Sequence, residues 1–449
     1  MDGGRQQLQR RRPEQSVLHR AVREGWPLVL AAAEAQGGFP KRVHEEVRRY
    51  LACGDVRRGF TLVKCTDCAA SALIAFSCKS RGWCPSCAAR RAHEASLHLL
   101  EVLPQIPYRQ WTLSLPFALR FTVVKEPKLL RVLERCVTRS IFRWLRARAK
   151  QLGHGGRLLC GSVCFVQLFS SSLTLQPHFH LLVPQGIFDG ATFIELPPPS
   201  QEEVEGVLAR MLAQARRTFE SLEAAWPLDA FEALKRQSAQ ERLDLGVLPQ
   251  RQGKALVAVG EGFSLHAGTK THANDRHALA RLCRYGARGP IAESRLTLRE
   301  DGRYEYQTKK GVTLVLTAAQ LTRRLISLIP PVRLHLVNFY GAFSSHSNAR
   351  STLLPKAAPL EQAKASGTTA TSPKTKRPRI DWATLHARTW GVDVWLCTCG
   401  GKRKVMALVT SRRIAEEMLR NMGLLPPSSP RPVALAQAPP QLELLPHSN

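Results

Sequence analysis

Two pairs of cysteines, each with two residues between its members, constrain the fold more than any other feature of the sequence. Cys65 and Cys68 form the first pair, Cys84 and Cys87 the second, and 15 residues separate the pairs. A two-residue spacing lets one tight turn direct both thiolates at the same ion, and the intervening loop returns the second pair. The spacing predicts a zinc site with four cysteine ligands, structural rather than catalytic because four thiolates leave no open position.

Other cysteines leave the ligand set open. Cys53 and Cys78 lie close to the pairs in sequence, and either can replace a member of a pair or simply pack. A redox pair or plain buried cysteines are the alternatives to zinc. Near the other end, Cys397 and Cys399 form a C-x-C pair, which lacks two ligands, and the nearest candidate, His386, would supply only one.

The charge balance indicates a partner rich in phosphate. The chain has 65 Lys and Arg against 35 Asp and Glu, a formal net charge of +30. Such an excess suits a protein that neutralises nucleic-acid phosphates. A membrane surface is the rival explanation, but no basic amphipathic helix or lipid signal is placed for it. No apolar run reaches roughly 18 residues and no secretory leader is evident, so we expect a cytoplasmic, nucleic-acid-binding protein without a membrane partner.

Composition and periodicity divide the chain into segments. Helices and mostly antiparallel strands alternate without a βαβ rhythm, which favours the α+β class. The expected segments are an N-terminal helical segment (1–52), a zinc-binding ribbon (53–103), a central domain (104–350), a linker (351–381), a small C-terminal unit (382–424) and a disordered tail (425–449).

Within the central domain the pattern predicts specific elements. The expected strands are 106–121, 158–169, 177–183, 255–260, 263–267, 304–308 and 312–316. The expected helices are 126–152, 202–237 and 274–288.

One predicted strand, 177–183, carries two histidines at alternate positions. On a β-strand this spacing directs His178 and His180 to one face and Phe179 to the other. Two neutral imidazoles that converge from one face can hold a divalent cation. A packed, hydrogen-bonded histidine pair is the alternative.

Downstream, a tyrosine lies on a strongly basic predicted helix. Tyr285 is accompanied by Arg281, Arg284 and Arg288, and the helix ends at Gly289-Pro290. A lone tyrosine usually packs in a core, but arginines on the same helix can hold a phosphodiester beside it. A phenol is a poor nucleophile while protonated, and a metal that polarises the phosphate supplies the missing activation.

These motifs resemble a known family. A histidine–hydrophobic–histidine strand followed by a tyrosine helix is similar to HUH endonucleases, which include replication initiators, relaxases and some transposases. The closer resemblance is to rolling-circle transposases of the insertion sequence 91 group, including common-region elements. It covers roughly residues 15–425 and rests on the ordered segments AFSCKSRGWCPSCAARR, QWTLSLPFALRF, HFHLLVPQGIF, GFSLHA, RLCRYGARGPIAESRL and IPPVRLHLVNFYGAF.

The resemblance implies an HUH-like antiparallel sheet with flanking helices, placed after the zinc-binding module. It implies that His178 and His180 hold Mg²⁺ or Mn²⁺, and that Tyr285 forms a 5′-phosphotyrosine. HUH sites usually add a third ligand, for which Gln167 on the neighbouring strand is the first choice and Asp275 and Glu293 are alternatives. The implied zinc ligands are the four cysteines of the two C-x2-C pairs.

The resemblance also implies a single-tyrosine enzyme, because some relatives carry a second tyrosine four residues away, where this chain has Arg281 and Gly289. The implied substrates are single-stranded DNA at element ends and a target DNA, with Arg281, Arg284 and Arg288 in contact with DNA. The chain contains no phosphate-binding G-x4-G-K-[ST] loop, so host helicase and polymerase are expected partners. The alternatives are a replication initiator or relaxase, a zinc-ribbon DNA-binding regulator, and a nuclease that uses activated water.

Overall fold

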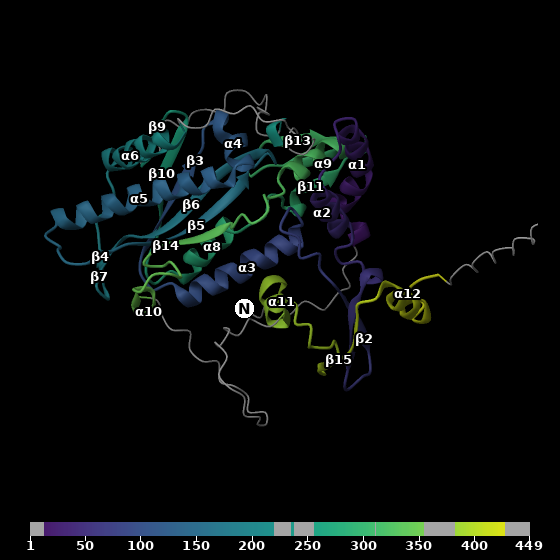
Figure 1. The fold of residues 1–449 in the computed structure, drawn as a ribbon. Helices are drawn as coiled ribbons and strands as arrows, with labels where there is room; N and C mark the ends of the chain where they lie inside the picture. Colours follow the sequence, from purple (N-terminus) through teal and green to yellow (C-terminus); the bar gives the residue numbers. More distant parts are fainter. Residues whose placement is uncertain (1–12, 220–234, 238–255, 310, 354–381, 427–449) are drawn as a thin grey trace, which may run out of the picture.

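A computed structural model describes residues 13–219, 235–237, 256–309, 311–353 and 382–426 (Figure 1). Helices and antiparallel sheets make up these parts, which confirms the α+β class. Within the described residues, no helix is both long and apolar enough to cross a membrane.

The N-terminal third is mostly helical, with one hairpin. Its elements are η1 (Pro13–Gln15), α1 (Val17–Glu34), α2 (Lys41–Leu51), η2 (Val56–Arg58), β1 (Phe60–Cys65), β2 (Ser71–Ala75) and α3 (Pro85–Val102). The expected N-terminal helical segment is therefore two helices, since Gly37 and Gly38 adopt positive φ between them. Helix α1 packs against α9 (Ala318–Ser327), so this segment is fixed to the central domain.

The central domain is built on a six-stranded antiparallel sheet of order β14-β5-β6-β3-β10-β9. Its strands are β3 (Tyr108–Ser114), β5 (Gly161–Phe169), β6 (Leu175–Pro184), β9 (Val257–Gly260), β10 (Phe263–Thr271) and β14 (Val337–Gly341). Its helices are α4 (Arg120–Lys125), α5 (Pro127–Gln151), α6 (Gln201–Phe219) and α8 (Arg276–Gly286), with η3 (Phe117–Leu119) before α4. The predicted strand 106–121 is thus a strand that gives way to a helix after Pro116.

Two smaller sheets complete this domain. One has the order β4-β7-β8 and the other β11-β12-β13. The elements are β4 (Leu158–Leu159), β7 (Gly186–Asp189), β8 (Thr192–Glu195), η4 (Glu293–Arg295), β11 (Leu296–Leu298), β12 (Tyr304–Gln307) and β13 (Thr313–Leu316). The last two strands form the hairpin expected around Lys309.

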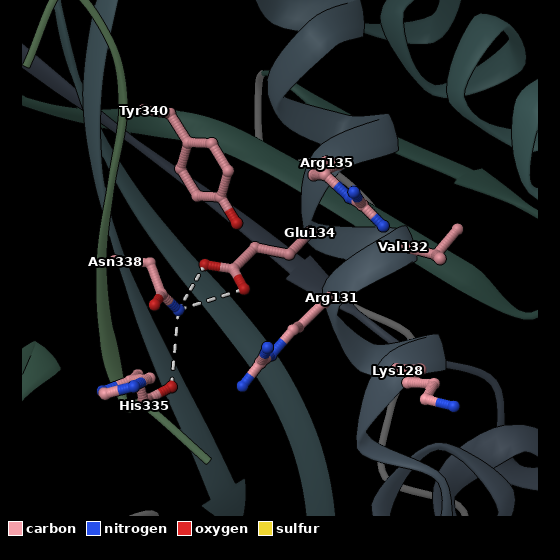
Figure 2. A pocket seen from close by; sticks show the side chains of 8 residues that line it. All are labelled: Lys128, Arg131, Val132, Glu134, Arg135, His335, Asn338 and Tyr340. Atoms are coloured by element: carbon pink, nitrogen blue, oxygen red, sulfur yellow. Dashed lines mark hydrogen bonds between the residues drawn. The ribbon is translucent and has the colours of Figure 1, made fainter. Parts of the chain in front are cut away.

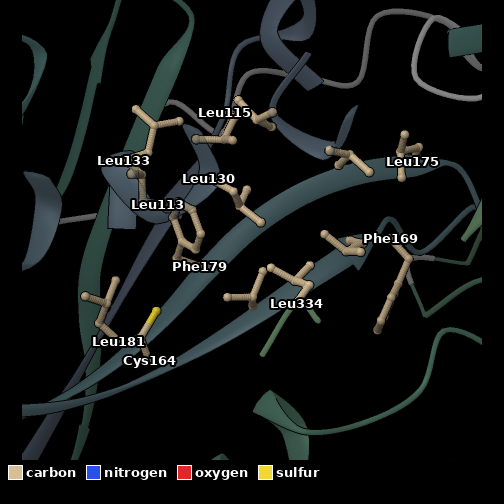
Figure 3. Close-up of a cluster of buried hydrophobic side chains, with 14 of the residues drawn as sticks. Leu113, Leu115, Leu130, Leu133, Cys164, Phe169, Leu175, Phe179, Leu181 and Leu334 are labelled. Carbon is tan, nitrogen blue, oxygen red and sulfur yellow. The ribbon is translucent and has the colours of Figure 1, made fainter. Parts of the chain in front are cut away.

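The two faces of the central sheet have different neighbours. Helices α5 and α6 cover one face, while α8, backed by α3, covers the other (Figure 1). Phe179 and Leu181 of β6 are buried under α5 beside Leu130 and Leu133, as Figure 3 shows. Strand alternation therefore turns His178 and His180 toward α8. The apolar side of β6 anchors the strand that carries the histidines.

The C-terminal residues join the zinc-binding ribbon. They form α11 (Trp382–Trp390), β15 (Arg403–Val409) and α12 (Arg412–Asn421). Strand β15 pairs with β1 in a three-stranded sheet of order β15-β1-β2. The ribbon (53–103) and the C-terminal unit (382–424) were expected to be separate, and the structure corrects this, because the middle strand of their common sheet is β1.

Some expected segments lie outside the described residues. These are positions 354–381 of the expected linker, 427–449 of the expected tail, and 220–234 of the helix expected over 202–237. The first three positions of that linker, 351–353, lie in the short helix α10 (Arg350–Leu353).

Candidate active site and cysteine clusters

The two histidines of β6 lie side by side on the face that α8 covers. Their ring centroids are 4.9 Å apart with an interplanar angle of 76°. In the sheet register His180 lies opposite Thr112 of β3, and His178 lies opposite Gln167 of β5. The strand spacing thus brings the imidazoles together as the sequence predicts.

Burial favours the neutral form of both imidazoles. The His178 Nδ1–H donates to the Gln176 carbonyl over 2.9 Å, which leaves the lone pair on Nε2. The His180 Nδ1 lies 2.9 Å from the Gln110 side-chain Nε2 and 3.1 Å from Thr112 Oγ1, and its Nε2 is buried without a hydrogen-bond partner. Burial lowers the pKa of His178 to about 4 and holds that of His180 well below its usual range.

Gln167 connects the histidine strand to the tyrosine helix. It is buried, and its side-chain Nε2 donates to the carbonyls of Tyr285 at 2.6 Å and Gly286 at 3.0 Å. Its Oε1 has no partner, so an acceptor oxygen remains free beside the histidines.

The other two proposed third ligands are engaged elsewhere. Asp275 caps the far end of α8 by accepting from Ala278 N at 2.7 Å. Glu293 accepts a hydrogen bond from Ser16. The structure therefore brings only Gln167, of the three, to the histidine pair.

Tyr285 lies in the last turn of α8, against the histidines. Its ring centroid is 5.4 Å from that of His180, and the side chain is half-buried. The next residue, Gly286, allows this approach, because a Cβ there would lie 2.5 Å from the ring of Phe165. The end of α8 therefore rests directly on the sheet.

The other five tyrosines of the chain lie elsewhere. Tyr50 packs on Trp83, Tyr108 and Tyr304 are fully buried, Tyr306 is buried beside Ala292, and Tyr340 lies on the face that α5 covers. Among the six tyrosines, Tyr285 alone is in contact with the histidine pair.

Cations surround the Tyr285 ring. The Arg288 guanidinium lies 4.8 Å from the ring centroid, and Lys309 Nζ, from the β12–β13 turn, lies 4.8 Å from it. Arg120, at the start of α4, is close enough to His178 to lower its pKa further. The Nε atoms of Arg120 and Arg288 are both buried without a partner, so an anionic ligand could still satisfy them.

Arg120 and Lys309 were not among the residues predicted from the sequence. They come from other segments than the histidines and the tyrosine: Arg120 from the expected strand 106–121, and Lys309 from the expected hairpin. Of the three predicted arginines, Arg288 lies at the tyrosine, whereas Arg281 and Arg284 are exposed on α8, Arg284 near His93 of α3.

A separate pocket of about 550 Å³ lies on the opposite face of the sheet, between α5 and β14 (Figure 2). Its polar centre is Glu134, which accepts from Asn338 Nδ2 at 2.9 and 3.1 Å. Burial raises the pKa of this carboxyl. Lys128, Arg131 and Arg135 project from α5 around it. Because the sheet separates this pocket from the histidines, it is no part of the candidate active site.

The cysteines form two clusters rather than one. Cys53, Cys78, Cys84 and Cys87 make the first, and Cys65, Cys68, Cys397 and Cys399 the second, with ligand atoms within 4.8 Å of one another in each. The prediction that the two C-x2-C pairs share one ion is therefore wrong. Each pair instead combines with two other cysteines, and in the second cluster these two, Cys397 and Cys399, come from the C-terminal unit.

The first cluster, termed here the inner cluster, is attached to the tyrosine helix through α3. Cys84 is the N-cap residue of α3 and Cys87 lies in its first turn. Hydrogen bonds from Cys53 and the neighbouring thiols hold the pKa of Cys87 well below its usual range. Further along α3, Ser96 Oγ donates to the Ala280 carbonyl of α8 at 3.1 Å. A folded inner cluster therefore fixes the support on which α8 lies.

The second cluster, termed the outer cluster, is partly open to solvent. Cys65 and Cys397 are buried, whereas Cys68 and Cys399 are exposed. The Cys399 backbone N–H lowers the pKa of Cys397 to about 6, so a thiolate is favoured there.

Two family models match the chain. A transposase family model, Y2_Tnp, matches residues 161–350, and a transposase zinc-binding domain model matches residues 24–115. No curated protein and no solved structure matches the chain. Both family matches are to transposases, so the chain is an enzyme that acts on DNA. The zinc-binding model is that of insertion sequence 91 transposases, so the two matches together are those of a transposase of this family, as the sequence motifs predicted.

Proposed function

We propose that this transposase cuts and joins DNA through Tyr285, with a 5′-phosphotyrosine intermediate. The observation that carries the proposal is the contact between Tyr285 and a neutral histidine pair, 5.4 Å between ring centroids, in a chain whose other tyrosines lie elsewhere. In the attack, a bond forms between the tyrosine oxygen and phosphorus, and the bond from phosphorus to the 3′ oxygen breaks. The phenolic proton ends on the released 3′-hydroxyl, so the reaction is balanced without a co-reactant.

The donors at this site fit a divalent cation. His180 Nε2 and Gln167 Oε1 are buried without partners, and the hydrogen bond from His178 Nδ1 leaves its Nε2 lone pair free. Imidazole nitrogen with amide oxygen suits Mn²⁺ or Mg²⁺, and all three donors are neutral. A cation bound there polarises the scissile phosphate and stabilises the charge that develops on it.

The surrounding cations complete an anion site. Arg120 and Arg288 offer unpaired Nε atoms, and Lys309 lies over the tyrosine ring. We infer that they hold the phosphate groups on either side of the scissile bond. Exposed Arg281 and Arg284 extend the positive charge along α8 and would follow the strand away from the site. A half-buried tyrosine between these cations favours a single strand, which can enter a narrow site.

The proposed reaction sequence is rolling-circle transposition. Tyr285 nicks one strand at an element end, the released 3′-hydroxyl primes displacement synthesis, and the attached 5′ end is transferred to a target. The phosphotyrosine retains the energy of the phosphodiester, so the transfer needs no nucleotide hydrolysis. Host helicase and polymerase would unwind and copy the strand, in the cytoplasm and at the nucleoid.

A covalent-adduct assay tests the proposed function. Purified protein is mixed with single-stranded oligonucleotides from the ends of its own element, labelled at the 5′ or 3′ terminus, in Mn²⁺ or in EDTA. We expect a denaturation-resistant protein–DNA adduct that carries only the 3′-side fragment, and only in Mn²⁺. Cleavage without an adduct would instead identify water as the nucleophile, and binding without cleavage would favour a regulator.

Lys309→Ala should slow adduct formation by about 10- to 100-fold, because it removes a cation that would stabilise the negative charge developing beside the tyrosine during the attack. Lys309 is exposed, so its replacement should leave folding unchanged. Single-turnover rates with saturating oligonucleotide measure the effect. The matched control is Lys404→Ala, which removes the same charge from exposed strand β15. An equal rate for both variants would show that Lys309 does not act at the site.

A further inference from the structure

The outer cluster joins two parts of the chain that are distant in sequence. Cys65 and Cys68 lie at the end of β1 and in the turn after it, whereas Cys397 and Cys399 precede β15. The matched zinc-binding region ends at residue 115, so the second pair lies outside both family matches. All four thiols are free.

The separations between the sulfur atoms fit one metal ion. Four thiolates held about 2.3 Å from a zinc ion in a tetrahedron stand about 3.8 Å from one another. In the outer cluster Cys65 Sγ lies 3.5 Å from Cys399 Sγ, and Cys68 Sγ lies 3.7 Å from Cys397 Sγ. The inner cluster, inside the zinc-binding region, shows the same spacing, with Cys53 Sγ 3.6 Å from Cys84 Sγ.

The backbone around the outer cluster is shaped for metal ligands. The Asp67 N–H points at Cys65 Sγ over 3.4 Å, as in a turn that supports a thiolate. Gly401 passes so close that a Cβ would lie 2.9 Å from Cys65 Sγ. The two turns are also joined directly, because Thr66 N donates to the Lys402 carbonyl at 2.9 Å. A C-x-C pair followed by two glycines can therefore take the place of a second C-x2-C pair.

We propose that Cys65, Cys68, Cys397 and Cys399 form a second structural zinc site, which fastens the C-terminal strand β15 to the ribbon. The apolar contact between these parts is small: its buried residues are Val56, Phe60, Val409, Ala415 and Leu419. The ion would supply the free energy that so small a core lacks. The ribbon is then complete only when residues after 396 are present.

Metal analysis of the full chain tests the ligand assignment. Protein purified with a thiol reductant and no chelator should contain two zinc ions per chain, one for each cluster. The double variant Cys397→Ser/Cys399→Ser should contain one. The control Cys136→Ser, at a cysteine of α5 outside both clusters, should keep two. One zinc in the unaltered chain, or two in the double variant, overturns the proposal.

Cobalt substitution gives a measurement that needs no variant. Cobalt bound by four thiolates absorbs strongly through charge transfer, so this band should rise linearly up to two equivalents in the unaltered chain. A band that saturates at one equivalent overturns the second site, whether or not the double variant folds.

A cleavable chain tests the fastening role. A protease site inserted between residues 353 and 382 allows the chain to be cut without touching either cluster. The C-terminal fragment, which contains residues 382–426, should stay bound to the rest of the chain in zinc, and the double cysteine variant should lower the retained fraction at least about tenfold. Cys136→Ser should retain it. Equal retention in the double variant and the control overturns the fastening role.

Discussion

Replacement of Tyr285 by phenylalanine is expected to abolish the covalent protein–DNA adduct while leaving the binding of single-stranded DNA unchanged. The variant keeps the ring that lies 5.4 Å from His180 and 4.8 Å from Arg288, and removes only the oxygen that would attack phosphorus. Loss of a nucleophile lowers turnover by on the order of 10⁴-fold or more. Adduct formation is measured on denaturing gels and binding by fluorescence anisotropy.

The matched control is Tyr306→Phe. Tyr306 is buried on β12, and its hydroxyl accepts only a long hydrogen bond, 3.4 Å from Ala292 N. This variant should form adduct at the rate of the unaltered chain. An adduct that persists in Tyr285→Phe would contradict the proposed mechanism, and so would an equal loss in both variants, since that would point to folding rather than chemistry.

The sequence predicted the histidine strand and the tyrosine helix because each depends on local periodicity. Alternation along residues 177–183 places His178 and His180 on one face whatever the rest of the chain does. Gln167 was identified by its place on the strand expected to pair with that segment, and the register sets it opposite His178. The hydrogen bonds from Gln167 to the end of α8 depend on tertiary packing, which no spacing encodes.

The grouping of the cysteines was not predictable in the same way. The 15 residues between the C-x2-C pairs allow one shared ion, and equally allow each pair to find other ligands. The pairing of β1 with β15 decides between these arrangements, and that contact joins positions more than 300 residues apart, such as Phe60 and Val409. Local pattern carries no information on a contact of this range.

Arg120 and Lys309 were missed for a related reason. Each is one of 65 lysines and arginines, and neither stands beside the histidines or the tyrosine in the sequence. They become distinctive through position, Arg120 by its charge effect on His178 and Lys309 by its approach to the tyrosine ring. In a chain with a net charge of +30, the sequence indicates that phosphate groups are bound. The fold determines which of the many cations lie at the phosphate group that reacts.

His178→Ala and His180→Ala are expected to lower adduct formation by about 10³-fold and to remove its dependence on Mn²⁺, because each deletes a nitrogen donor of the proposed ion. The control is His346→Ala, at an exposed histidine after β14. Thermal unfolding checks that His180→Ala, which empties a buried position, still folds. Normal Mn²⁺-dependent adduct formation in either histidine variant would contradict the proposed ion site.

The pH dependence of Mn²⁺ affinity distinguishes the buried histidine pair from ordinary surface imidazoles. Protons compete with the ion for the ring nitrogen, and a histidine with a pKa near 6.5 would be about 90% protonated at pH 5.5. Burial lowers the pKa of His178 to about 4 and holds that of His180 well below its usual range, so we expect both to stay neutral at pH 5.5, and His178 to be protonated only as the pH falls through about 4. Mn²⁺ affinity, measured by calorimetry, should therefore change less than about twofold between pH 7.5 and 5.5. A tenfold loss over that range would mean that the imidazoles titrate as exposed groups do, and that the buried, neutral pair is not what binds the ion.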